Sequence, residues 1–152
     1  MSSGKSDDEG DLMTNIFREP LDYRPPSPSP TGTTYTLLRG SPTLSLSLVG
    51  TSPLWGHILW HTSTTLAGYL EQRPELVKRK SILELGAGAG LPSLVSAILG
   101  ARRICVTDYP DADLIANLEH NVEECRQHWD KDVEVEAEVS GHQHCCVYVA
   151  WD

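Results

Sequence analysis

The chain has 152 residues, a length typical of one domain, and its 12 Lys and Arg against 21 Asp and Glu give a net charge of -9. Because an excess of acid disfavours contact with a phosphate backbone, we expect no nucleic-acid partner. The first residues lack the apolar core of a signal peptide, and no apolar run is long enough to cross a bilayer. These features predict a cytoplasmic protein with no membrane partner.

The N-terminal segment is too polar to build a core. Residues 1–32 begin with Ser, Gly and acid and end in the proline-rich stretch "PLDYRPPSPSPTG". Such a composition predicts a disordered arm followed by an extended linker. The composition changes at Thr33, where we expect the folded part to begin.

A β-hairpin and a helix are predicted next. In "TTYTLLR" and "TLSLSLVG", Leu44, Leu46 and Leu48 alternate with serine, as in a strand with one buried face. The stretch "WGHILWHTSTTLAGYLEQ", residues 55–72, has apolar residues at helical intervals, and Pro74 follows it. The sequence therefore predicts a hairpin leading into a helix over 55–72.

The remaining sequence alternates between strand and helix patterns. "SILEL" reads as a strand, "LPSLVSAIL" as a helix closed by Gly100, and "RRICVTD" as a second strand. A longer helix follows with Asp111 as its N-cap, and "DVEVEAEV" is the third strand. This order predicts an α/β, Rossmann-like fold with a parallel sheet and right-handed crossovers.

A glycine-rich loop follows the first of these strands, at the sheet edge where ligands of such folds bind. Gly86, Gly88 and Gly90 permit positive φ angles and a close approach of the backbone to a ligand. The loop is not a full dinucleotide fingerprint, because Leu91 stands where the third glycine would be. Glu84, two residues before the loop, would face a pyrophosphate badly but suits a ligand with a positive charge.

A second carboxylate follows the next strand. Asp108 ends "RRICVTD", where it can accept hydrogen bonds from both hydroxyls of a ribose. An adenosyl ligand with a cationic far end fits Asp108 and Glu84 together, and S-adenosylmethionine has both parts. The alternative is a tight turn from strand to helix that holds no ligand.

These motifs carry a family resemblance. "ILELGAGAG" and "VTDYPD" resemble motif I and its successor in the seven-strand S-adenosylmethionine-dependent methyltransferases. More narrowly, "EPLDYRPPSPSP", "LVGTSPLWGHILWHTSTTLAGYL" and "ILELGAGAGLPSL" resemble the fungal N-terminal and lysine methyltransferases of elongation factor 1-alpha, a family also labelled nicotinamide N-methyltransferase-like. The resemblance runs from about residue 16 to 138. It implies that elongation factor 1-alpha is the protein substrate and that the cofactor contacts lie at Trp60, Gly86, Ala87, Gly88 and Asp108.

The family's sheet has seven strands, and this sequence supplies the first three. We therefore expect a partial methyltransferase domain over 33–138, an irregular tail over 139–152, and one unpaired edge on the strand "SILEL". We expect the chain to be a monomer whose methyltransferase activity is absent or impaired, and we assign no catalytic residue. Two alternatives stay open: a small-molecule, nicotinamide-type N-methyltransferase, and a non-catalytic fragment. An NAD-binding domain is disfavoured by Leu91 and Glu84.

The cysteines and histidines indicate no metal and no disulfide. The four cysteines have no CxxC spacing, and a reducing compartment keeps them as thiols. In the tail, adjacent cysteines chelate a metal awkwardly, and no second cluster completes a four-ligand site. The cysteines and the tail histidines are Cys105, Cys125, Cys145, Cys146, His142 and His144.

Overall fold

The computed structural model describes residues 28–52, 55–139 and 147–151. Its helices and strands, in chain order, are β1 Thr31–Thr36, β2 Thr43–Leu48, α2 His61–Gln72, β3 Ser81–Leu85, α3 Leu91–Ile98, β4 Arg103–Asp108, α4 Ala112–Cys125, β5 Glu134–Val139 and β6 Val147–Trp151. Short 3-10 turns follow α2 and α4, at Pro74–Leu76 and Arg126–His128. Among the described helices none is long and apolar enough to span a membrane.

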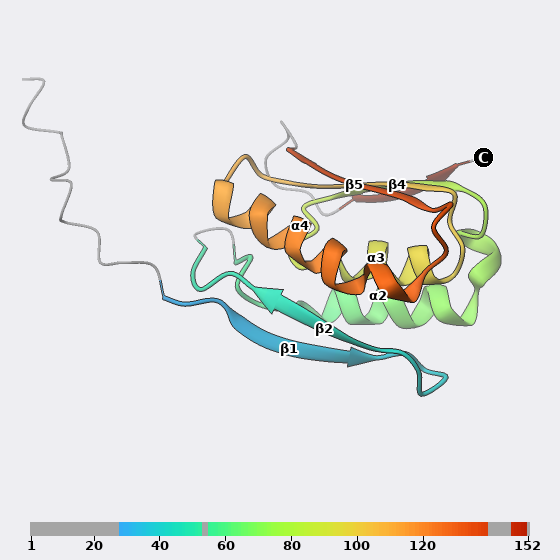
Figure 1. Ribbon diagram of the computed structural model, residues 1–152, viewed down its shortest axis with the longest axis horizontal. Helices are drawn as coiled ribbons and strands as arrows, with labels where there is room; N and C mark the ends of the chain where they lie inside the picture. The colour runs from blue at the N-terminus through green and yellow to red at the C-terminus, as the bar shows by residue number, and fades with distance from the viewer. Residues whose placement is uncertain (1–27, 53–54, 140–146, 152) are drawn as a thin grey trace, which may run out of the picture.

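The main sheet has four strands in the order β5-β4-β3-β6. β3 pairs in parallel with β4, and β4 in parallel with β5, as the alternation of strand and helix patterns predicted. Figure 1 shows this sheet with α3 and α4 beneath it and with α2 and the hairpin below them. The described helices thus cover one face of the sheet.

The core lies between the sheet and these helices. Every second strand residue points toward the helices, as the period of a strand requires. The fully buried side chains include Ile82, Ile104 and Val106 from the strands and Leu91, Leu94, Val95 and Leu118 from the helices. The predicted N-cap of α4 is confirmed, because the carboxylate of Asp111 accepts hydrogen bonds from the backbone N–H groups of Asp113 and Leu114.

The hairpin packs on the helices through its apolar face. β1 and β2 pair antiparallel as predicted, with Leu44, Leu46 and Leu48 buried. β1 begins at Thr31, so its first two residues lie within the linker predicted to end at residue 32. Residues 1–27 lie outside the described part. Tyr35 and the backbone of Leu38 both donate to the buried carboxylate of Glu71 on α2, at 2.8 and 2.7 Å.

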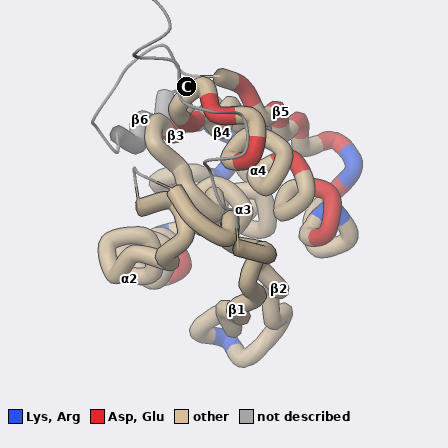
Figure 2. The backbone as a smooth tube through the Cα atoms, turned by 90° about the vertical axis from the view of Figure 1, so that its left-hand side faces the viewer, with Lys and Arg blue, Asp and Glu red and all other residues tan. Residues whose placement is uncertain are grey.

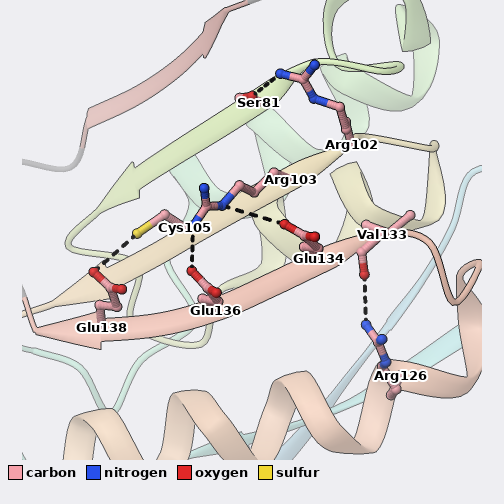
Figure 3. A network of polar contacts seen from close by, with 9 residues as sticks. All are labelled: Ser81, Arg102, Arg103, Cys105, Arg126, Val133, Glu134, Glu136 and Glu138. Atoms are coloured by element: carbon pink, nitrogen blue, oxygen red, sulfur yellow. Dashed lines mark hydrogen bonds and ion pairs between the residues drawn. The ribbon is translucent and has the colours of Figure 1, made fainter.

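The outer face of β4 and β5 is polar. Arg103 lies 3.1 Å from Glu136 and 3.8 Å from Glu134 on the neighbouring strand, and the Cys105 thiol lies beside Glu138 (Figure 3). Because these side chains are about half exposed or more, the ion pairs contribute little to stability. Figure 2 shows that acidic residues are frequent along the backbone near β5 and α4, whereas the hairpin has few charged residues.

The structure also contradicts the predicted start of the helix over 55–72, the irregular tail and the unpaired edge of β3. The helix predicted over 55–72 begins only at His61, because Trp55 has a positive φ of 62° and residues 55–58 form a turn. The tail predicted as irregular contains β6, which pairs antiparallel with β3 and places Leu83 opposite Val149. β6 therefore satisfies the backbone groups at the edge of β3 that was predicted to be unpaired, and the sequence "VYVAW" has the β-branched and aromatic residues that favour a strand.

Candidate functional site

The glycine loop lies where the carboxyl ends of β3 and β4 meet. Gly86, Gly88 and Gly90 all have positive φ, at 66, 58 and 74°. A Cβ atom on Gly88 would meet nothing within 4 Å, whereas one on Gly90 would lie 2.8 Å from the Leu118 side chain. Gly90 therefore packs closely against α4, and Gly88 borders open space that a ligand can enter.

Asp108 is joined to this loop directly. Its Oδ2 accepts a hydrogen bond of 2.6 Å from the backbone N–H of Gly88, and its Oδ1 accepts one of 2.7 Å from the N–H of Tyr109. A carboxylate has about four acceptor positions, so each oxygen can accept one further bond. The structure thus brings together Gly86, Ala87, Gly88 and Asp108, and their contact with a cofactor stays a prediction.

Thr107 fixes the loop to the strand ends. Its backbone carbonyl accepts the N–H of Ala87 at 3.0 Å, and its hydroxyl donates to the carbonyl of Glu84 at 2.9 Å. These bonds hold the start of the glycine loop beside the last residues of β4. Sequence reasoning did not single out Thr107, because its partners depend on the parallel register of β3 and β4.

Glu84 is buried and bonded to the first turn of α3. Its Oε2 accepts a hydrogen bond of 3.0 Å from the backbone N–H of Ser93 and a second from the Ser93 hydroxyl. The N-cap of α3 is Gly90, which has no side chain to accept from the first turn, and Glu84 supplies that acceptor from the neighbouring strand. Ser93 was missed because this capping does not come from the usual N-cap position.

The protonation of Glu84 is shifted by the same surroundings. The pKa of Glu84 is raised to about 7, mainly by burial and to a smaller extent by the nearby charge of Asp108, while the two bonds from Ser93 act in the opposite direction. The carboxyl is therefore poised between its charged and neutral forms near neutral pH. Its predicted contact with a cationic ligand stays a prediction.

Trp60 lies at the N-cap of α2, which packs against α3. Its side chain is 52% exposed, and its indole N–H donates to the backbone carbonyl of Trp55 at 3.2 Å. The exposed indole is available to cover a ligand, which is the role that the resemblance implies. His57 is half-buried and stacks on Trp55, and its buried Nδ1 has no partner among the described residues.

The cysteines and possible metal ligands of the described residues do not form a cluster. Cys105 and Cys125 are free thiols, and the described residues contain no group of three or more His, Cys, Asp or Glu that could hold a metal. The tail residues weighed above as metal ligands, His142, His144, Cys145 and Cys146, lie outside the described residues.

Fold and loop geometry together define the class: a Rossmann-like methyltransferase domain, with a glycine loop and a strand-end carboxylate at the carboxyl edge of a parallel sheet. A family model described as lysine methyltransferase matches residues 43–143. The chain belongs to this family.

Curated relatives agree with this assignment. The protein N-terminal and lysine N-methyltransferase EFM7 of Gibberella zeae is 50% identical over 116 residues, which cover 76% of this chain and 42% of the relative. The proteins of the same name from Neurospora crassa and Yarrowia lipolytica are 45 and 38% identical, covering 78 and 92% of this chain and 43 and 54% of their own length. The chain spans about half the length of the curated relatives it matches.

Proposed function

We propose that residues 33–138 bind S-adenosylmethionine, and that the chain belongs to a protein N-methyltransferase that modifies the N-terminal residue, a nearby lysine, or both, of elongation factor 1-alpha in the cytoplasm. The observation that carries the cofactor proposal is the 2.6 Å bond between Asp108 and the N–H of Gly88, which joins the strand-end carboxylate to the glycine loop. The relatives are named as methyltransferases of protein N-termini and lysines, which supports a protein acceptor.

The residues of the loop fit the proposed cofactor. Asp108 retains acceptor capacity for two ribose hydroxyls after its two backbone bonds. Gly88 borders open space, so that the cofactor can approach the backbone there. Trp60 offers an exposed aromatic surface that can exclude water from one side of the ligand.

Methyl transfer depends mainly on alignment of the two reactants. When bound, S-adenosylmethionine supplies a methyl group on a positively charged sulfur, which an uncharged amine nitrogen takes up as the carbon–sulfur bond breaks and a proton leaves the nitrogen. Asp108 and the glycine loop would fix the adenosyl end, and Glu84 lies on the same edge as a buried carboxyl. We assign no catalytic base.

Calorimetric titration of the purified chain tests the cofactor proposal. We expect S-adenosylmethionine and S-adenosylhomocysteine to bind and NAD⁺ not to bind. Circular dichroism on the same sample shows whether the chain is folded. A folded chain that takes up neither adenosyl ligand would refute the proposal and leave the ligand-free turn as the better explanation of the glycine loop.

Transfer of labelled methyl groups tests the acceptor. The N-terminal peptide of elongation factor 1-alpha is compared with the same peptide acetylated at its N-terminus, with one whose lysines are replaced by arginine, and with nicotinamide. Label on the first peptide that either blocked peptide reduces supports a protein acceptor. Label on nicotinamide alone would instead support the small-molecule methyltransferase.

A further inference from the structure

One buried side chain connects the glycine loop to the hairpin. Asn121, on α4, is 0% exposed. Its Oδ1 accepts a hydrogen bond of 2.7 Å from the backbone N–H of Ser47, and its Nδ2 donates to the carbonyls of Ser47 at 2.9 Å and of Ala89 at 3.1 Å. The side-chain amide therefore uses its acceptor and both of its donor hydrogens on two backbone segments.

The bond to Ala89 lies at the centre of the loop. Ala89 stands between Gly88, whose N–H is bonded to Asp108, and Gly90, whose N–H is bonded to the carbonyl of Ala87. A loop with three glycines at positive φ loses much conformational entropy when it is ordered, so contacts from outside the loop are needed to hold it. Asn121 supplies a polar contact of this kind, and Leu118, three residues earlier on α4, supplies an apolar one at Gly90.

We propose that Asn121 is a positioning residue for the cofactor loop: by bonding Ala89 while it is anchored on Ser47, it holds residues 86–90 in the conformation that binds S-adenosylmethionine. This inference rests on the proposed function. It also gives the hairpin a role at the site, although no β2 side chain is among the contacts of Asp108 in the described part of the chain. The hairpin supports the amide that in turn supports the loop.

A neighbouring asparagine provides a matched control. Asn117, one turn earlier on α4, is also buried and donates to the same carbonyl of Ser47 at 2.9 Å. Among the described residues, its side chain bonds the hairpin and not the glycine loop. Asn121→Leu and Asn117→Leu therefore make the same chemical change on the same helix, and the change at residue 121 also removes the bond to Ala89.

The test measures ligand affinity and stability separately on the purified chain. S-adenosylhomocysteine is titrated by calorimetry into the unmodified chain and both variants, and urea unfolding is followed without ligand. We expect both variants to be less stable, because each leaves a buried backbone group with fewer partners. We expect Asn121→Leu to bind the ligand about tenfold more weakly, and Asn117→Leu to stay within about twofold of the unmodified chain.

A second measurement needs no variant, so it keeps the inference testable even if Asn121→Leu does not fold. Hydrogen exchange is followed at the backbone N–H of Ser47 with and without S-adenosylhomocysteine. Because this N–H is bonded to Asn121, ordering of the loop by the ligand should slow its exchange, and the N–H of Thr33, which lies opposite Leu46 in the hairpin, serves as the reference.

The outcomes separate the two proposals. If the unmodified chain is folded and binds no adenosyl ligand, the proposed function fails and this inference fails with it. If the unmodified chain binds, equal affinity in Asn121→Leu, an equal loss in Asn117→Leu, or unchanged relative exchange at Ser47 would overturn the positioning role alone. A loss confined to Asn121→Leu together with slowed exchange at Ser47 supports it.

Discussion

Asp108 orders the glycine loop through one carboxylate oxygen and its own strand end through the other. Oδ2 accepts from Gly88 and Oδ1 from Tyr109, so the group is held in place before any ligand arrives. A hydrogen-bonding group that is already oriented loses less entropy when it binds a ligand. At the scale of one residue, this carboxylate therefore joins the structure of the loop to its proposed chemistry.

Replacing Asp108 should weaken cofactor binding. In Asp108→Ala the ribose hydroxyls lose a charged acceptor, and a loss of about 1 to 3 kcal/mol in the binding free energy of S-adenosylmethionine is expected. Calorimetric titration measures the change. Asp113→Ala is the control, because Asp113 is an exposed carboxylate on the first turn of α4 and should leave the affinity unchanged. Equal affinities for Asp108→Ala and the unmodified chain would remove the adenosine assignment.

Glu84 should make stability depend on pH. Burial raises the pKa of Glu84 to about 7 from an ordinary value of 4.5, so the folded chain binds this proton more tightly than the unfolded chain does. The resulting stabilisation is complete below pH 4.5 and is lost as the pH rises to about 7. Glu84→Gln cannot titrate, so relative to the unmodified chain its free energy of unfolding should rise across this window by on the order of 3 kcal/mol.

Urea unfolding of both proteins at pH 4.5, 5.5, 7 and 8 measures this difference. Glutamine keeps an oxygen that can accept from Ser93, so the helix cap is largely retained in the variant. Two stability profiles that run parallel from pH 4.5 to 8 would show that Glu84 does not titrate in this range.

Most elements were predictable from local patterns. The alternation of Leu44, Leu46 and Leu48 indicated the hairpin, and Asp111 indicated the start of α4. Both signals depend only on residues that are close together in the sequence. The start of α2 was not predictable in this way. Residues 55–60 have a helical apolar pattern, but the positive φ of Trp55 interrupts it. β6 was missed because its partner β3 is more than 60 residues away.

The residues of the candidate site also differ in whether the local sequence could reveal them. Gly86, Gly88 and Asp108 were recognisable because a glycine-rich loop after one strand and a carboxylate at the end of the next form a known sequence pattern of such folds. Ser93 and Asn121 were not, because a buried serine or asparagine on a helix has no distinctive local pattern. Their roles depend on which backbone or carboxylate group the fold brings to them.

The two glycines at Gly88 and Gly90 should respond differently to alanine. Both have φ angles that an L side chain rarely adopts, so each substitution should cost about 1 to 2 kcal/mol of stability. At Gly90 the new Cβ would also lie 2.8 Å from Leu118, so Gly90→Ala should be the less stable variant. At Gly88 the Cβ would enter the open space where the ligand is proposed to bind. Relative to its loss of stability, Gly88→Ala should therefore lose more ligand affinity than Gly90→Ala does.

Urea unfolding of both variants ranks their stability, and titration with S-adenosylhomocysteine ranks their ligand affinity. Gly32→Ala serves as the control, because Gly32 lies in β1 without a positive φ and its Cβ would meet nothing within 4 Å. A Gly88→Ala protein that is less stable than Gly90→Ala would contradict the packing of Leu118 described above.

At the scale of the whole molecule, the hairpin and the sheet should unfold together. Cys125 is 1% exposed on α4 where this helix packs against β2, with its Sγ 3.9 Å from the carbonyl of Ser45, and burial raises its pKa to about 11. Cys105 lies half-buried on the outer face of the sheet. A thiol reagent should therefore label Cys105 in the folded chain and Cys125 only when the hairpin leaves α4 or the chain unfolds.

Two single-cysteine proteins, with Cys145 and Cys146 replaced by serine in both, measure this difference. The labelling rate of Cys125 should rise with urea as steeply as the equilibrium constant for unfolding, and that of Cys105 should change little. A weak dependence on urea at Cys125 would mean that the hairpin detaches by itself while the sheet stays folded.

The attachment of the hairpin to α4 also determines when the hairpin can pack during synthesis on the ribosome. β2 emerges early, but the N–H of Ser47 finds its partner 74 residues later, at Asn121. Neither the apolar face of β2 nor the glycine loop can complete its contacts before α4 is present, since the carbonyl of Ala89 also bonds the side chain of Asn121. The nascent chain therefore exposes Leu44, Leu46 and Leu48 until α4 has left the exit tunnel, and this interval is when a chaperone would be needed to prevent aggregation.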